Sequence, residues 1–239
     1  MKGIELAARF SYITNSLRFC GPKEASKQFL QYLSNKNNGQ KVKESLLKFE
    51  GLYPYLSSIA EKNKKDIFDY EVIEAYWIGN KLLDSFENKD IKEIIKKLMQ
   101  RGLPKSIGNN LIEDLPSGFV PHHNFNVMYV GVGRVTGSVE MNLQNMDNCR
   151  VSWGKVLEVF QDKLLVQSNT LVKNKNKFEL NQNEAKTAVY MPQMLPNIKK
   201  NDIVALHWGF APVILTKGQL RNLEKYTQLT MGILNRSEY

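Results

Sequence analysis

Cysteine and histidine are scarce in this chain, which has two cysteines and three histidines among 239 residues. Two cysteines far apart cannot form the disulfide framework of a small secreted protein. The sequence also lacks a run of the ~18 apolar residues that a bilayer-spanning helix needs, and its beginning lacks the profile of a signal peptide. We therefore expect a cytoplasmic protein that does not enter a membrane.

Several common catalytic motifs are missing as well. The sequence has no serine-hydrolase elbow, no Walker loop and no dense metal-binding motif. Gly131, Gly133 and Gly137 do not have the spacing of a dinucleotide fingerprint. The sequence motifs therefore point to no established class of enzyme.

The net charge of +9 raises the question of nucleic-acid binding. Lysine and arginine occur in both halves of the chain and alternate with acids, as in residues 87–97. Such alternation is typical of a solvated helix face with ion pairs one turn apart. We therefore do not expect nucleic acid as the partner, although a nucleic-acid-binding barrel stays open as a second alternative.

The first half of the chain has the pattern of amphipathic helices. Apolar side chains recur at helical spacing in residues 22–33, 72–83 and 91–98, and Pro54 interrupts another helical segment. We predict a helical N-terminal domain over residues 1–120.

The second half of the chain favours β-structure. Residues 125–133 are apolar and β-branched, and we expect residues 121–148 to form an extended connecting segment. Residues 156–160 and 164–168 predict a hairpin, residues 185–190 and 203–207 predict further strands, and residues 219–234 predict a terminal helix. The fold class we predict is α+β, with a small β-barrel and C-terminal helix over residues 149–239.

Cys149 and His207 are the main candidates for a metal site. A thiolate and an imidazole are donors that soft and borderline metals prefer. Two donors are too few for a closed structural zinc site, so they favour a labile or shared site. Cys149 is also a candidate reactive thiol, and we expect the neighbouring Arg150 and Lys155 to lower its pKa.

The remaining Cys and His residues are further metal candidates with structural alternatives. Cys20 resembles a small, buried apolar residue as much as a ligand. His122 and His123 are adjacent, so on an extended segment their side chains point in opposite directions and at most one faces a given site.

Two segments of the second half, from Cys149 to Val156 and from Asp202 to Ala211, together resemble the HypC/HupF family of [NiFe]-hydrogenase maturation chaperones. The first runs from Cys149 to a Gly-Lys-Val strand opening at residues 154–156, and the second contains Asp202 and a His-Trp-Gly-Phe-Ala sequence at residues 207–211. The resemblance covers about residues 149–235. Two departures stand out: the cysteine is internal here rather than next to the initiator methionine, and Trp153 stands in place of the family proline.

The resemblance carries expectations about fold, metal and partners. It implies an OB-like barrel with a C-terminal helix, and a maturation accessory protein or chaperone that handles an iron site through Cys149 and His207. The iron would be transient and would carry diatomic ligands. The partner would be the immature hydrogenase large subunit or a HypD-like scaffold protein.

Segments of the first half, near residues 15–22, 49–55, 74–80 and 121–125, resemble an uncharacterised family that fuses a helical half to such a module. That similarity implies an architecture but no activity. The first alternative function that we leave open is an enzyme with an interdomain metal or thiol site that acts on a small molecule.

Overall fold

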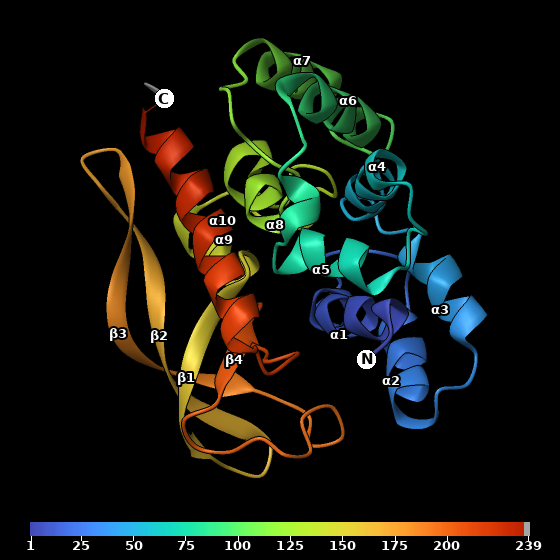
Figure 1. Cartoon of the computed structure of the whole chain (residues 1–239), viewed down its shortest axis with the longest axis vertical. Coiled ribbons are helices and arrows are strands. Elements are labelled where there is room, and N and C mark those ends of the chain that lie inside the picture. Colours follow the sequence, from blue (N-terminus) through green and yellow to red (C-terminus); the bar gives the residue numbers. More distant parts are fainter. Residues whose placement is uncertain (237–239) are drawn as a thin grey trace.

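The computed structural model describes residues 1–236 as an α+β structure, in which an antiparallel sheet lies beside a set of helices (Figure 1). The helices of the first half are α1 (Gly3–Ser16), α2 (Ala25–Asn35), α3 (Gly39–Leu46), α4 (Tyr53–Asn63), α5 (Tyr70–Trp77), η1 (Lys81–Leu83), α6 (Asn88–Met99) and α7 (Lys105–Glu113). The α+β class and the helical first half are as expected. Within residues 1–236, every helix is too short or too polar to cross a membrane.

Helix α6 shows how local sequence sets these elements. Its buried residues Ile91, Ile94, Ile95 and Leu98 recur at helical spacing, so they form one apolar face. Asp90 and Glu87 form a reciprocal capping box at its N-terminus, which satisfies backbone N–H groups that would otherwise lack a partner.

The helix predicted over residues 72–83 is shorter than expected. Helix α5 ends at Trp77, and Gly79 follows with φ of +97°. A Cβ atom at Gly79 would lie 2.0 Å from the Tyr226 ring, so only glycine allows this approach of the chain to α10. The chain therefore turns here and resumes as the short helix η1.

The expectation of an extended segment over residues 121–148 is wrong. These residues contain α8 (His123–Phe125), the π-helix η2 (Asn126–Gly131) and most of α9 (Leu143–Cys149). Residues 127–131 are all buried, and a segment that is apolar on every side does not reveal its period. Its β-branched composition therefore indicated a strand where the structure has a π-helix.

Four strands form one antiparallel sheet in the order β3-β2-β1-β4: β1 (Ser152–Val159), β2 (Lys163–Asn174), β3 (Lys177–Val189) and β4 (Ile203–Leu206). The predicted hairpin is confirmed, since Val156 pairs with Val166 and Val159 pairs with Leu164. Strands β2 and β3 join through a two-residue turn at Lys175 and Asn176, both with positive φ. Isolated bridges at Phe210 continue the pairing beyond β4.

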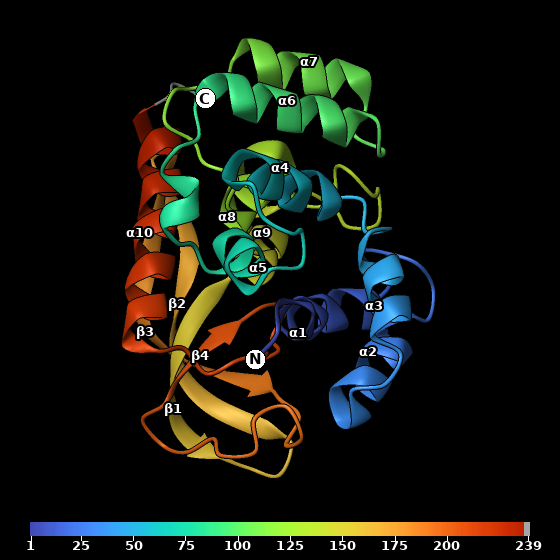
Figure 2. The ribbon, with the colours of Figure 1, turned by 45° about the vertical axis from the view of Figure 1, so that its right-hand side comes forward.

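The terminal helix α10 (Lys217–Arg236) connects the sheet with the helices. Asn235 exchanges two hydrogen bonds with the backbone of Phe178 in β3, while the Tyr226 hydroxyl donates to the carbonyl oxygen of Asn80. Figure 2 shows α10 along one side of the molecule, with its C-terminal end toward α6 and α7. The buried apolar core runs continuously through residues of both halves.

Candidate metal centre

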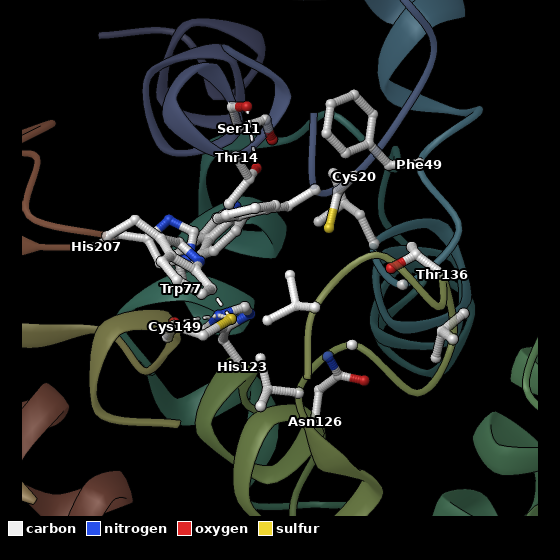
Figure 3. Close-up of a pocket in the computed structure, with 18 of the residues that line it drawn as sticks. Ser11, Thr14, Cys20, Phe49, Trp77, His123, Asn126, Thr136, Cys149 and His207 are labelled. Carbon is white, nitrogen blue, oxygen red and sulfur yellow. Dashed lines mark hydrogen bonds between the residues drawn. The ribbon is translucent and has the colours of Figure 1, made fainter. Parts of the chain in front are cut away.

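Three side chains that can ligate a metal meet where the helices contact the sheet: His123 of α8, Cys149 at the end of α9, and His207 directly after β4 (Figure 3). Their donor atoms all lie within 4.8 Å of one another. The Cys149 sulfur is 3.9 Å from Nε2 of His123 and 4.0 Å from Nε2 of His207. The structure thus places the predicted pair, Cys149 and His207, side by side and adds His123.

His207 is oriented by a contact with the first helix. Its Nδ1 donates a hydrogen bond to the backbone carbonyl of Phe10 in α1, at 3.2 Å. Because a carbonyl only accepts, Nδ1 carries the proton and the lone pair of Nε2 faces Cys149. A metal-binding histidine commonly has its other nitrogen fixed in this way.

A tight turn holds the backbone of His207. His207 and Phe210 exchange two backbone hydrogen bonds, and Trp208 and Gly209 between them have φ of +51° and +67°. Positive φ at a bulky residue such as Trp208 is uncommon and costs free energy. The backbone N–H of Trp208 donates to the carbonyl of Asn148 at 2.6 Å, which ties the turn to the residue before Cys149.

His123 has partners at both ring nitrogens. Nδ1 lies 3.0 Å from the Tyr76 hydroxyl and Nε2 lies 2.9 Å from the carbonyl oxygen of Cys149. In this arrangement Nε2 donates to the carbonyl and Nδ1 accepts from the tyrosine. A metal at Nε2 requires the other tautomer, in which Nδ1 donates to Tyr76.

Asn124, next to His123, positions α8. Its fully buried amide accepts from the backbone N–H of Val151 at 2.9 Å and donates to the Thr227 hydroxyl at 2.9 Å. One side chain therefore joins α8 to the start of β1 and to α10.

Cys149 is placed by the anchoring of α9 to the sheet. Arg150 is fully buried, and it donates to Asp147 and to Asn169 of β2. Asp147 also accepts from the backbone N–H of Leu171 and from the Lys186 ammonium group. The expectation that Arg150 would activate the thiol is wrong, because its guanidinium group is engaged by Asp147 instead.

Burial dominates the electrostatics of the three groups. It raises the pKa of the Cys149 thiol, and the nearby Cys20 thiol raises it further, whereas the indole N–H of Trp208 opposes both by favouring the thiolate. Burial lowers the pKa of His123 to about 4 and holds that of His207 well below its usual range. Without a metal the site therefore contains a neutral thiol and neutral imidazoles. A bound cation would deprotonate the thiol outright.

The three groups open onto a small cavity of about 60 Å³. Figure 3 shows the sulfur of Cys20 pointing into this space from the side opposite His207 and Cys149. Most of the wall is apolar or aromatic, and it includes Trp77, Trp208 and Phe49. A metal at the three ligands would thus have one side facing a confined, largely apolar space.

The two sulfur–nitrogen spacings are close to those that one shared metal ion requires. Metal–sulfur and metal–nitrogen bonds of roughly 2.3 and 2.0 Å at a tetrahedral angle place sulfur and nitrogen about 3.5 Å apart. The observed separations of 3.9 and 4.0 Å exceed this value by a few tenths of an ångström. Three protein ligands with an open fourth position are typical of catalytic or labile metal sites rather than closed structural ones.

The other candidates from the sequence lie in different surroundings. His122 is buried away from this group, with its ring stacked on Tyr226 at 5.7 Å and its Nδ1 accepting from the backbone of Asn124. Cys20 lines the cavity, and burial together with the charge of Glu50 raises its pKa to about 12.

Sequence reasoning did not identify three parts of this site. Tyr76 and Trp77 lie in a segment that the sequence marked only as a helix, although Tyr76 contacts His123 and Trp77 packs on both histidine rings. No sequence pattern identifies the backbone carbonyl of Phe10, because every residue has a backbone carbonyl. Only the scarcity of histidine pointed to His123.

A family model described as a family of unknown function, DUF6390, matches residues 1–239, and the chain therefore belongs to this family. No curated protein and no solved structure matches the chain.

Proposed function

We propose that this DUF6390 protein binds one transition-metal ion through His123, Cys149 and His207 and acts as an accessory protein in the maturation of a metalloenzyme. The observation that carries the proposal is the convergence of three donor atoms within 4.8 Å at a buried position. One ring nitrogen of each imidazole is held by a protein group, His207 by the Phe10 carbonyl and His123 by the Tyr76 hydroxyl, as is common for metal-binding histidines.

The donor set narrows the choice of metal. One thiolate and two imidazoles suit iron, cobalt, nickel, copper or zinc, and are a poor match for magnesium or calcium, which take oxygen ligands. The metal would supply a Lewis-acidic centre with an open coordination position. The chain would supply orientation through Tyr76 and Phe10 and exclusion of bulk water through the surrounding aromatic wall.

The resemblance of residues 149–235 to HypC/HupF proteins supports maturation as the role. It assigns Cys149 and His207 to the handling of an iron site, and these are two of the three groups that meet. An antiparallel sheet followed by a packed terminal helix is compatible with a HypC-like barrel, and the bridge between Val189 and Phe210 would help to close it. On this proposal the metal is iron with diatomic ligands, and the partner is a hydrogenase large subunit or a HypD-like scaffold.

The experiment is metal analysis and infrared spectroscopy of protein purified anaerobically from its own host. We expect bound iron with infrared bands of cyanide or carbonyl ligands, and loss of hydrogenase activity in a host that carries only the Cys149→Ser variant. Full hydrogenase activity in that host would reject the maturation role. Absence of any bound metal would reject the metal site itself.

The cavity favours an enzyme as a second candidate function. Three ligands with an open position beside a confined space are an arrangement that catalytic metal sites use, with the substrate taking the fourth position. Metal-dependent turnover of a small molecule by the purified protein, together with an intact hydrogenase in the Cys149→Ser host, would support this candidate over maturation.

A further inference from the structure

Three buried polar atoms around the cavity lack a hydrogen-bond partner. They are the Ser11 hydroxyl oxygen and the indole nitrogens of Trp77 and Trp208, counted over residues 1–236. All three belong to side chains that line the cavity beside the metal ligands. In folded proteins the great majority of buried hydrogen-bond donors have a partner. Three unpaired donors at a single cavity therefore point to a missing partner.

The three groups do not have the same role. The Trp208 indole N–H favours the thiolate of Cys149, so it gains a partner when the sulfur loses its proton to a metal. The indole N–H of Trp77 and the hydroxyl of Ser11 still lack a hydrogen-bond partner. An indole nitrogen only donates, and therefore the partner of Trp77 must present a hydrogen-bond acceptor.

Charge balance adds a second requirement. A divalent ion with one thiolate and two neutral imidazoles has a net charge of +1 at a buried position. No lysine, arginine, aspartate or glutamate is among the residues that line the cavity. An uncompensated buried charge is costly, and a monoanion at the open position would neutralise it.

The volume sets the size of that ligand. About 60 Å³ of free space corresponds to roughly four to six water-sized positions. A ligand of about three to five non-hydrogen atoms fits this space, whereas an aromatic acid exceeds it. The partly buried residues Phe19, Cys20, Thr136 and Val139 border the cavity and mark its side of entry.

We propose that the cavity takes a short carboxylate of the size of formate or acetate. One carboxylate oxygen occupies the fourth position of the metal, and the acceptor atoms face the indole N–H of Trp77 and the hydroxyl of Ser11. This inference rests on the proposed metal site, in the state in which the ion carries no diatomic ligands, and specifies what binds beside it.

The test uses the full chain loaded with cobalt(II), whose visible spectrum reports the fourth ligand. Formate, acetate and benzoate are titrated at constant ionic strength, and cobalt content is measured before and after. We expect saturable spectral changes with formate and acetate, and at least tenfold weaker binding of benzoate. Trp77→Phe and Ser11→Ala should each weaken acetate binding about tenfold, since each removes a hydrogen bond to a charged ligand.

The chain contains its own control variants. Trp153→Phe makes the same exchange in a tryptophan outside the cavity and should leave acetate affinity unchanged. Trp208→Phe should shift the sulfur-to-cobalt charge-transfer band more than it changes acetate affinity. Ser11→Ala serves as the second donor variant if Trp77→Phe fails to fold.

Cobalt retained with no saturable effect of formate or acetate would overturn the carboxylate ligand and leave the metal site standing, with water or hydroxide as the fourth ligand. Acetate affinity that is unchanged in both donor variants, or equal affinity for benzoate, would overturn it as well. Failure to bind cobalt would refute the metal site, and the carboxylate ligand with it.

Discussion

His207 donates a hydrogen bond to the carbonyl of Phe10, a residue 197 positions earlier in the chain. The contact joins the end of β4 to the first helix and fixes which nitrogen of the imidazole faces Cys149. The tautomer of His207 that leaves Nε2 open toward Cys149 is therefore set by the helical half of the protein.

Replacing the thiol should separate metal binding from folding. Cys149→Ser removes the only thiolate among the three ligands, and we expect metal content to fall from about one ion per chain to near zero. The exchange changes side-chain volume little, so the melting temperature of the metal-free protein should change by only a few degrees. Metal analysis and thermal unfolding measure the two effects.

Cys20→Ser is the matched control for that variant. Cys20 lines the same cavity but is not one of the three converging ligands. We expect metal content to be retained and the melting temperature to change by only a few degrees, as for Cys149→Ser, because both cysteines are partly buried and the exchange changes side-chain volume little. Equal loss of metal in both variants would show that Cys20 is a fourth ligand.

Tyr76 should tune the affinity for metal without touching it. Tyr76→Phe removes the group that orients Nδ1 of His123 at 3.0 Å, and such losses typically weaken metal binding by about 10- to 100-fold. Tyr55→Phe removes a hydroxyl that donates to Asn126 and should leave affinity unchanged. Competition with a chromophoric chelator gives both constants, and identical values for the two variants would contradict the role of Tyr76.

The metal-free protein should lose stability in mild acid because of its buried histidines. Burial lowers the pKa of His122 to about 3 and of His123 to about 4, and it lowers that of His207 as well. The unfolded chain binds protons on histidine near pH 6.5, whereas the folded chain does not, so the free energy of unfolding falls as the pH drops below ~6.5. At about pH 5 we expect a loss of about 2 kcal/mol for each histidine.

Urea unfolding at about pH 7.5 and about pH 5 measures this dependence. The His122→Phe variant should reduce the loss by the contribution of one histidine, since His122 lies outside the metal group. A free energy of unfolding that is the same at both pH values would show that the histidines are not held neutral in the fold.

Asn124 should be among the most sensitive positions for stability. Asn124→Ala leaves the backbone N–H of Val151 and the Thr227 hydroxyl without a buried partner, which costs about 2–4 kcal/mol in the free energy of unfolding. Thr227→Val removes only the second of these contacts and should cost less. Denaturant unfolding ranks the two variants, and a larger effect of Thr227→Val would contradict this account.

Periodicity predicted most of the regular elements, because one apolar face per helix and alternate apolar residues per strand are local properties. The hairpin of β1 and β2 and the face of α6 are examples. The segment around η2 was predicted incorrectly because it is buried on all sides. Of the site, donor chemistry indicated Cys149 and His207, but the convergence with His123 depends on distant contacts such as that between Asn124 and Val151, which no local pattern encodes.

The hydrogen bond between Phe10 and His207 also dictates when the site can form during synthesis. The first helix leaves the ribosome long before residue 207 is made, and Tyr226 of α10, which packs against Gly79, follows later still. Contacts between residues so far apart form late, because the intervening chain must first be ordered. If the proposed metal site exists, loading of the metal would follow the synthesis of α10, because Thr227 of this helix holds Asn124 next to His123.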